Sequence, residues 1–226
     1  YMKYLKMKTI VALSCLCLSS VFFACKNENK GTNKSEQTEL KNLTQYVDPY
    51  IGTGDHGHVF MGANVPFGLV QLGPTNFSQG WDWCSGYHIT DSTIIVFCHM
   101  HLSGTGIGDL GDISFMPATG NVILERGNLE NPESGIYSLF SHDTEKTKPG
   151  YYAVHLDRFN INVGLTATKR IGFHKYTFPQ SDDAKIIMDL EHGIGWDRPV
   201  NGLVTQENDT VISGYRYSEG WAKDQR

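Results

Sequence analysis

The stretch GYYAVHLDRFNINVGLTATKRIGFHKYTF, residues 150–178, decides the fold. Apolar and polar residues alternate in YYAVHLD and in HKYTF, which predicts strands with one buried and one wet face. The chain shows no helical periodicity over three turns. Strands are therefore expected at 68–72, 93–99, 150–157, 161–168, 170–178, 185–190 and 210–218. Turn signals at 148–150, 179–183 and 208–209 separate several of them, and this spacing predicts an all-β sandwich or barrel.

Length and composition set the remaining limits on the fold and the partners. A chain of 226 residues allows one large domain or two small ones. With 40% hydrophobic and 12% aromatic residues, it can bury a sizeable core. The net charge of -5 and the pI near 6.0 give no basic surface, so nucleic acid is excluded as a partner.

The first residues resemble an export signal rather than part of the fold. Lys3, Lys6 and Lys8 precede an apolar run at 10–24 that is too short for a membrane span, and Cys25 follows at once. This pattern predicts a lipoprotein signal peptide at 1–24 and lipidation of Cys25, which would anchor an exported periplasmic or outer-membrane protein. The alternative is a plain signal peptide that is cleaved elsewhere. Residues 25–44 are then expected to be a polar tether, and 45–226 the folded domain.

Glycine is concentrated between residues 52 and 111, where twelve glycines interrupt regular structure. Long glycine-rich loops in a β protein are often functional, so the chemistry is expected here. SGTGIGDLGD (103–112) is not expected to bind phosphate, because no helix-forming segment follows it. Tight corners are expected instead, with Asp109 and Asp112 bonding nearby backbone.

Five histidines lie in the same region: His56, His58, His88, His99 and His101. His-x-His pairs can bind zinc, but no third ligand stands at a diagnostic spacing, so no metal site is predicted in this chain. Roles in anchoring loops or in bonding sugar hydroxyls are favoured. The aspartates of this region show no spacing that would select an acid and base pair for glycoside hydrolysis.

GWDWCSGYH (80–88) has two interpretations that the residues alone leave open. An indole can stack on the apolar face of a sugar while Asp or His bonds the hydroxyls, which would make a carbohydrate site. The segment could equally be a buried aromatic anchor, with Asp82 accepting from the indole N–H groups. Cys84 here and Cys98 could form one disulfide, but two cysteines do not decide the question.

Four segments together resemble glycoside hydrolase family 92, the calcium-dependent exo-α-mannosidases abundant in gut Bacteroidetes. They are 46–74, 80–92, 99–120 and 140–179. The resemblance implies an N-terminal β-sandwich (supersandwich) packed on a C-terminal (α/α)6 barrel, with the active site between them. It also implies inverting release of terminal mannose from N-glycans or mannan.

For this chain the resemblance implies substrate contacts at Trp81, Asp82, Trp83 and Cys84, and weaker candidates at His88, Gly54, His56 and His58. Two departures, Asp55 for a second glycine and Met61 for a proline, affect only the local loop.

The catalytic acid, the base and most Ca²⁺ ligands are expected from the barrel, which is absent from this chain. With ends at Tyr1 and Arg226, the chain is expected to be a truncated, inactive fragment. Its expected partners are mannose-terminated glycans, its own barrel, and a membrane through the lipid on Cys25. The alternative is a non-catalytic carbohydrate-binding sandwich or a pseudogene product.

Overall fold

The computed structural model describes residues 42–223, and the residues from Asn42 onward form one compact unit. The predicted signal peptide, Cys25 and most of the predicted tether lie outside the described residues. Within this range no helix has both the length and the apolar character needed to cross a membrane.

The described part of the chain contains β-strands and short 3-10 helices but no α-helix, so the all-β prediction is confirmed. The strands are β1 (Gly73–Thr75), β2 (Thr93–Ile94), β3 (Val96–Cys98), β4 (Ser114–Thr119), β5 (Ser138–Leu139), β6 (Lys146–Lys148), β7 (Tyr151–Leu156), β8 (Ile161–Ala167), β9 (Gly172–Thr177), β10 (Ala184–Asp189), β11 (Arg198–Asn208) and β12 (Val211–Glu219). The 3-10 helices are η1 (Leu43–Tyr46), η2 (Asp55–Gly57), η3 (Trp81–Trp83), η4 (Pro132–Ser134) and η5 (His142–Thr144).

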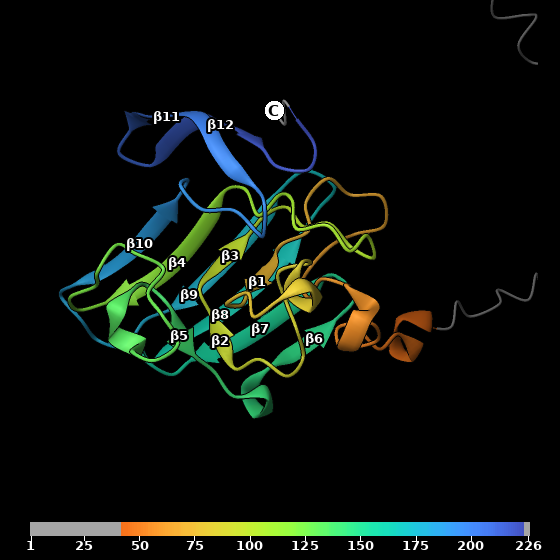
Figure 1. The fold of residues 1–226 in the computed structure, drawn as a ribbon. Coiled ribbons are helices and arrows are strands. Elements are labelled where there is room, and N and C mark those ends of the chain that lie inside the picture. The colour runs from red at the N-terminus through yellow and green to blue at the C-terminus, as the bar shows by residue number, and fades with distance from the viewer. Residues whose placement is uncertain (1–41, 224–226) are drawn as a thin grey trace, which may run out of the picture. The chain divides into compact units, whose positions relative to one another are not determined.

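Two antiparallel four-stranded sheets form the sandwich (Figure 1). One has the strand order β1-β3-β4-β10 and the other the order β6-β7-β8-β9. β2 pairs with β5, and β11 with β12, in two smaller sheets. The alternation of apolar and polar residues that predicted the strands also decides which side chains face the core. β8 buries Ile161, Val163, Leu165 and Ala167 and turns the residues between them outward.

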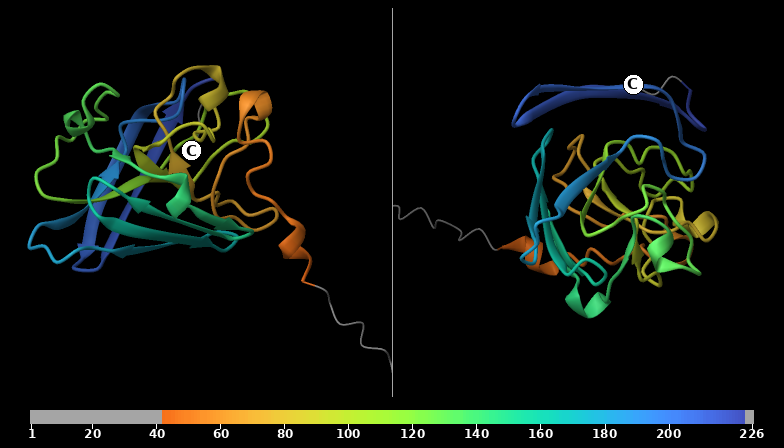
Figure 2. Two further views of the ribbon diagram at one scale, coloured as in Figure 1. Left: turned by 90° about the horizontal axis from the view of Figure 1, so that it is seen from below. Right: turned by 90° about the vertical axis from the view of Figure 1, so that its left-hand side faces the viewer.

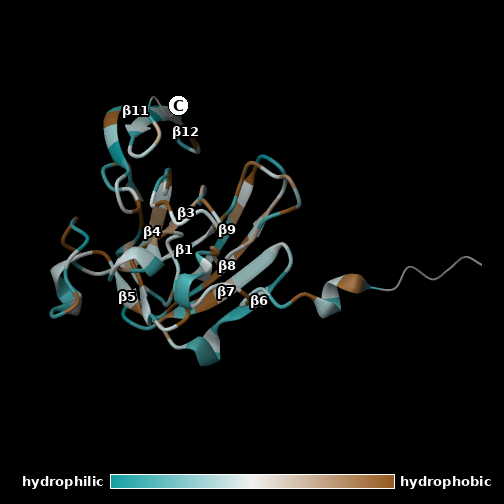
Figure 3. Cartoon of the chain, turned by 45° about the vertical axis from the view of Figure 1, so that its right-hand side comes forward, coloured by the Kyte–Doolittle hydropathy of each residue, from teal (hydrophilic) through white to brown (hydrophobic). Residues whose placement is uncertain are grey.

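The core lies between the two four-stranded sheets. β7 contributes Tyr152, Val154 and Leu156, and the opposite sheet contributes Phe97 and Met116 to the same cluster. Hydrophobic stretches run through the strands of both sheets (Figure 3). Each large side chain buried here contributes about 1.5–3 kcal/mol relative to an exposed one, so this cluster is the main source of stability.

Six of the seven predicted strand regions contain strands, and the prediction at 68–72 is wrong. There the backbone bonds in turn to three separate segments. Leu69 N donates to Lys169 O, Gln71 N donates to His99 O, and Leu72 bridges Ala63. A segment that crosses between neighbours in this way cannot extend a ladder with any one of them.

β11 and β12 form a long hairpin that pairs with no other strand of the described chain. Figure 2 shows this hairpin lying across one end of the sandwich. It carries exposed apolar side chains, namely Val200, Leu203, Val204, Val211, Ile212 and Tyr215. A two-stranded hairpin is marginally stable alone, so its anchoring to the sandwich matters.

Candidate functional site

Four loops that are far apart in sequence meet around η3. They carry the segments 52–58, 78–86, 104–111 and 193–197. The indole Nε1 of Trp81 donates to Gly106 O at 2.8 Å. The ring of His58 meets the same indole edge-on, with ring centroids 4.3 Å apart. Trp81 is 57% exposed. The hydrogen bond therefore fixes the polar edge of the indole, while much of its face remains open to solvent.

The open side of Trp81 borders a hollow of about 310 Å³. The hollow is lined by Ser78, Gly80, Trp81, Cys84, Gly108, Gly195 and Trp196. Two exposed indoles with small residues between them give the hollow an apolar surface. The volume of the hollow lies at the lower end of the range for ligand pockets. Trp196 was missed by sequence reasoning because it lies 113 positions beyond Trp83 in an isolated turn; its HGIGWD context was the available signal.

Close backbone contact brings Trp196 to this place. Its N–H donates to Gly108 O at 2.9 Å, and Ile194 N donates to Leu110 O at 3.2 Å. Gly195 has φ +59, and a Cβ there would lie 2.8 Å from Gly108 O. Only glycine combines this left-handed conformation with so close an approach. The predicted glycine-rich loop therefore does line a candidate site.

Trp83 and His88 face the protein interior instead. Their rings stack at 4.3 Å, and Trp83 Nε1 donates to Asp91 Oδ2 at 2.9 Å. His88 is buried, and its Nδ1 lies 2.8 Å from Thr90 Oγ1. Asp91 and Gly106 thus accept the two indole N–H groups, and Asp82, which the anchor interpretation required, does not. The segment combines both interpretations: Trp83 anchors, and Trp81 is exposed.

Asp82 binds two histidines from the 52–58 loop. Its Oδ1 lies 2.6 Å from His56 Nδ1 and 3.2 Å from His58 Nε2. The hydrogen bond to Asp82 raises the pKa of His56, and the same bond lowers the pKa of Asp82. His58 is buried, with φ 52, whereas the His56 side chain is 73% exposed. The third candidate ligand that sequence spacing did not reveal is therefore Asp82. Gly54, also a predicted contact, precedes η2 and lies against Ile89.

The other His-x-His pair belongs to the protein interior. His101 is buried between Gln71 O, 2.8 Å from its Nδ1, and Thr75 Oγ1, 3.2 Å from its Nε2. His99 Nε2 lies 3.1 Å from His174 Nε2. Burial lowers the pKa of His101 to about 4 and that of His174 to about 4. These neutral rings connect strands and loops.

Asp109 and Asp112 make long-range bonds: Asp109 bonds backbone, as predicted, but that of residues distant in sequence, and Asp112 pairs with a side chain. Asp109 accepts from the N–H groups of Trp221 and Ala222, both at 2.8 Å. Asp112 pairs with Arg216 of β12. The glycine-rich loop is thereby fastened to the end of the β11–β12 hairpin and the residues that follow it.

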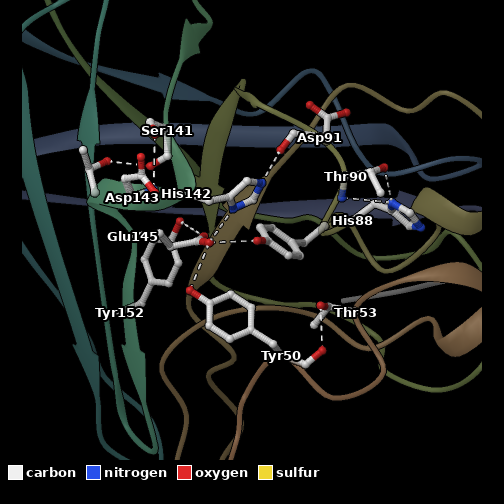
Figure 4. Close-up of polar contacts among 12 residues, drawn as sticks. Tyr50, Thr53, His88, Thr90, Asp91, Ser141, His142, Asp143, Glu145 and Tyr152 are labelled. Atoms are coloured by element: carbon white, nitrogen blue, oxygen red, sulfur yellow. Dashed lines mark hydrogen bonds and ion pairs between the residues drawn. The ribbon is translucent and has the colours of Figure 1, made fainter.

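A second cluster of polar side chains surrounds Glu145, but it lies inside the fold (Figure 4). The Glu145 side chain is fully buried. It accepts hydrogen bonds from the Tyr50, Tyr87 and Tyr152 hydroxyls at 3.3, 3.0 and 2.7 Å, and it lies 2.9 Å from His142 Nδ1. With these four partners and a fully buried side chain, Glu145 holds loops to the sheet and is not available to a substrate.

Cys84 and Cys98 are free and buried. Cys98 Sγ lies 3.1 Å from both Thr75 Oγ1 and Ser114 Oγ. The disulfide left open by the sequence is not formed.

Comparison with known families matches residues 46–226 to the glycosyl hydrolase family 92 N-terminal domain. The chain belongs to glycosyl hydrolase family 92. The resemblance stated from the four sequence segments is thereby confirmed, and with it the membership of a glycoside hydrolase family.

Solved structures of the family share the fold. A family 92 alpha-mannosidase from Bacteroides thetaiotaomicron, solved in complex with mannoimidazole, is 41% identical and superposes with a TM-score of 0.77, covering 80% of this chain and 24% of its own. The family 92 glycosyl hydrolase ccman5 is 26% identical, with a TM-score of 0.65, covering 79% of this chain and 24% of its own. A curated relative from Arthroderma benhamiae, an uncharacterised secreted glycosidase, is 26% identical over 143 residues, or 62% of this chain and 18% of its own.

This family 92 chain thus spans about a quarter or less of the relatives' length. Among the described residues, the candidate metal group His56–His58–Asp82 does not fit the calcium ion that the resemblance implies. Ca²⁺ takes six to eight oxygen ligands, whereas the His56–His58–Asp82 group offers two nitrogens and one carboxylate.

Proposed function

We propose that the chain is the N-terminal sandwich of an exported, inverting α-mannosidase that releases terminal mannose from N-glycans or mannan. In this proposal a C-terminal (α/α)6 barrel supplies the acid, the base and the Ca²⁺ ligands. The chain supplies one wall of the sugar site, a lipid on Cys25 holds the protein at a periplasmic or outer-membrane surface, and the chain alone is inactive.

The hollow between Trp81 and Trp196 carries the proposal for the sugar wall. Sugars present flat C–H faces that pack on indoles, and both side chains are more than half exposed beside this hollow. Cys84 lies in its lining, and Asp82 is the adjacent charged group. We expect Trp83 and His88 to support this wall from the side of the protein interior, where their rings stack on each other.

The test begins by sequencing the DNA that follows codon 226. A continuing open frame gives a full-length protein, to be assayed on α-mannobiosides. Trp81→Ala and Trp196→Ala should each lower kcat/KM by about tenfold or more, because each removes a face that packs on the sugar. NMR identifies which anomer of mannose is released first, and this tests whether the reaction inverts the anomeric configuration. Activity lost on chelation and restored by Ca²⁺ tests the metal.

Phe173→Ala is the matched control, since this aromatic side chain is 52% exposed on β9, outside the hollow. Equal effects of all three substitutions would contradict the sugar wall. A stop codon at this position would contradict the enzyme and leave the carbohydrate-binding module. That alternative predicts mannose binding by the chain alone, which tryptophan fluorescence would detect.

A further inference from the structure

The His56–Asp82–His58 group has the composition of a transition-metal site. Among the described residues it is the group of His, Cys, Asp and Glu whose potential ligand atoms lie within 4.8 Å of one another. We propose that these three side chains bind one divalent transition-metal ion of the zinc class.

The present distances already approximate those of a coordination sphere. At metal–ligand bonds of about 2.1 Å, neighbouring ligand atoms of a tetrahedron lie about 3.4 Å apart. The Asp82 oxygen lies 2.6 Å from one histidine nitrogen and 3.2 Å from the other. A metal would replace the protons that now join these atoms, and His56 would need only a modest rotation.

Two of the three ligands are held in place by the fold. His58 adopts a left-handed conformation, its carbonyl accepts from Gly104 N at 2.6 Å, and its ring packs on Trp81. Asp82 lies in the middle of η3, where Cys84 N donates to Trp81 O. His56, being exposed, is the ligand free to close on the ion. Such ordering lowers the entropic cost of binding.

The donor set selects the class of metal. Imidazole nitrogens suit Zn²⁺, Cu²⁺, Ni²⁺ and related ions, whereas Ca²⁺ and Mg²⁺ favour oxygen ligands. Three protein ligands leave at least one coordination position for water or a hydroxyl ligand. Because His56 is exposed, this position would face solvent beside Trp81.

The test is a titration of the metal-free chain with Zn²⁺, followed by calorimetry, after its accessible thiols have been alkylated. The chain has five cysteines, and alkylation prevents any thiol that reacts from contributing a ligand. We expect one ion per chain. His58→Ala and the near-isosteric Asp82→Asn should each weaken binding at least about tenfold to a hundredfold, which is the loss typical when only a partner that orients a metal ligand is removed.

Two matched controls come from other histidines. His155 of β7 lies 3.1 Å from Asn162, and His192 lies 3.0 Å from Asp189, which gives a pair without a third ligand. His155→Ala and His192→Ala should leave the Zn²⁺ affinity unchanged. The proposal is overturned if no stoichiometric binding occurs, or if affinity survives in both His58→Ala and Asp82→Asn with circular dichroism showing a folded chain.

The metal site adjoins the sugar wall, because His58 packs on Trp81, but the two proposals are tested separately. Zn²⁺ binding is measured without carbohydrate, and mannoside hydrolysis is assayed on Trp81 and Trp196 variants. Failure of either leaves the other result intact. Cobalt(II) offers a second readout, since coordination by His56, His58 and Asp82 should produce visible absorption that Asp82→Asn abolishes.

Discussion

Individual polar side chains inside the sandwich connect parts of the chain that hydrophobic contact alone would leave loosely joined. Glu145 joins Tyr50, Tyr87 and Tyr152 around one buried carboxylate. A buried charge is tolerated only when its lone pairs are satisfied, and here three tyrosine hydroxyls donate to it and His142 Nδ1 lies 2.9 Å away. Its removal therefore leaves several partners unpaired at once.

Glu145→Ala should destabilise the chain by about 3–5 kcal/mol, because three tyrosine hydroxyls lose their acceptor and His142 loses its contact with the carboxylate. Glu145→Gln keeps the volume and one oxygen and should cost roughly half as much. Urea denaturation gives both values. Glu130→Ala, at an exposed position, should lie within about 0.5 kcal/mol of the parent. A parent-like Glu145→Ala would show that the tyrosines find other partners.

The buried imidazole of His101 should make the free energy of unfolding depend on pH. Burial lowers its folded-state pKa to about 4, below the ordinary value of 6.5. Above pH 6.5 both states are neutral, so no difference arises. As pH falls toward 4, the unfolded state binds a proton that the folded state does not, and His101 alone lowers stability by about 2.5 kcal/mol by pH 4.5.

The measurement is the denaturation midpoint between pH 7.5 and 4.5. His101→Gln should flatten the slope even if it lowers stability at neutral pH. His155→Gln, on the outer part of β7, should leave the slope as it is. Parallel slopes in the parent and His101→Gln would contradict the assignment.

The strands differ greatly in how they are supported. β7 and β8 each have a neighbour on both sides and bury alternate residues in the core. β11 and β12 have only each other, and most of their side chains are exposed, although Arg216 and Ser218 near the end of β12 are buried. Local opening costs least where few apolar contacts cover the backbone.

Amide hydrogen exchange should therefore separate these elements. The inter-strand amides of β11 and β12 are expected to exchange at least about a hundredfold faster than those of β7 and β8, since the latter open only with the core. Mass spectrometry of peptides covering 161–167 and 203–213 would measure it. Equal protection would show that the hairpin is covered in solution.

Strand existence was predictable where period-two alternation was strong, as in β7 and β8. β4 was missed because its SFMPAT sequence contains Pro117 and its burial scarcely alternates. β11 was missed because Pro199 and Gly202 interrupt it and bulges shift its register. GLVQL looked like a strand, but no neighbour pairs along its length.

The candidate site was only half visible in the sequence. GWDWC and GDHGH indicated the right loops because unusual residue types cluster there. Trp196 and the Asp82–histidine contacts depend on tertiary convergence that no spacing encodes. Asp109 and Asp112 show the same limit: their partners lie more than a hundred residues later.

Across the molecule, Arg216 joins the hairpin to the site. Its Nη2 donates to Asp197 Oδ2 at 2.8 Å, its Nε donates to Leu190 O at 3.0 Å, and it pairs with Asp112. The side chain is almost fully buried. Asp197 follows Trp196 directly, so this ion cluster supports the turn that borders the hollow.

Arg216→Ala should destabilise the chain by about 3–5 kcal/mol, because two buried carboxylates lose their counter-ion. Arg216→Lys should recover little, since one ammonium cannot reproduce the three-way geometry of the guanidinium. Thermal unfolding gives the size of the effect, and exchange at 190–198 shows whether the loss is local. Arg198→Ala, which removes an exposed pair with Glu219, should change little.

The backbone contact between Gly108 and Gly195 has a consequence for synthesis on the ribosome. The chain emerges from its N-terminal side, so Trp81 and the glycine-rich loop leave the tunnel long before Trp196 does. Until then the hollow lacks one wall, and until Arg216 emerges Asp112 and Asp197 lack their cation. Nascent chains arrested before this point should present an open loop cluster to chaperones and proteases, and the site should close only when the hairpin arrives.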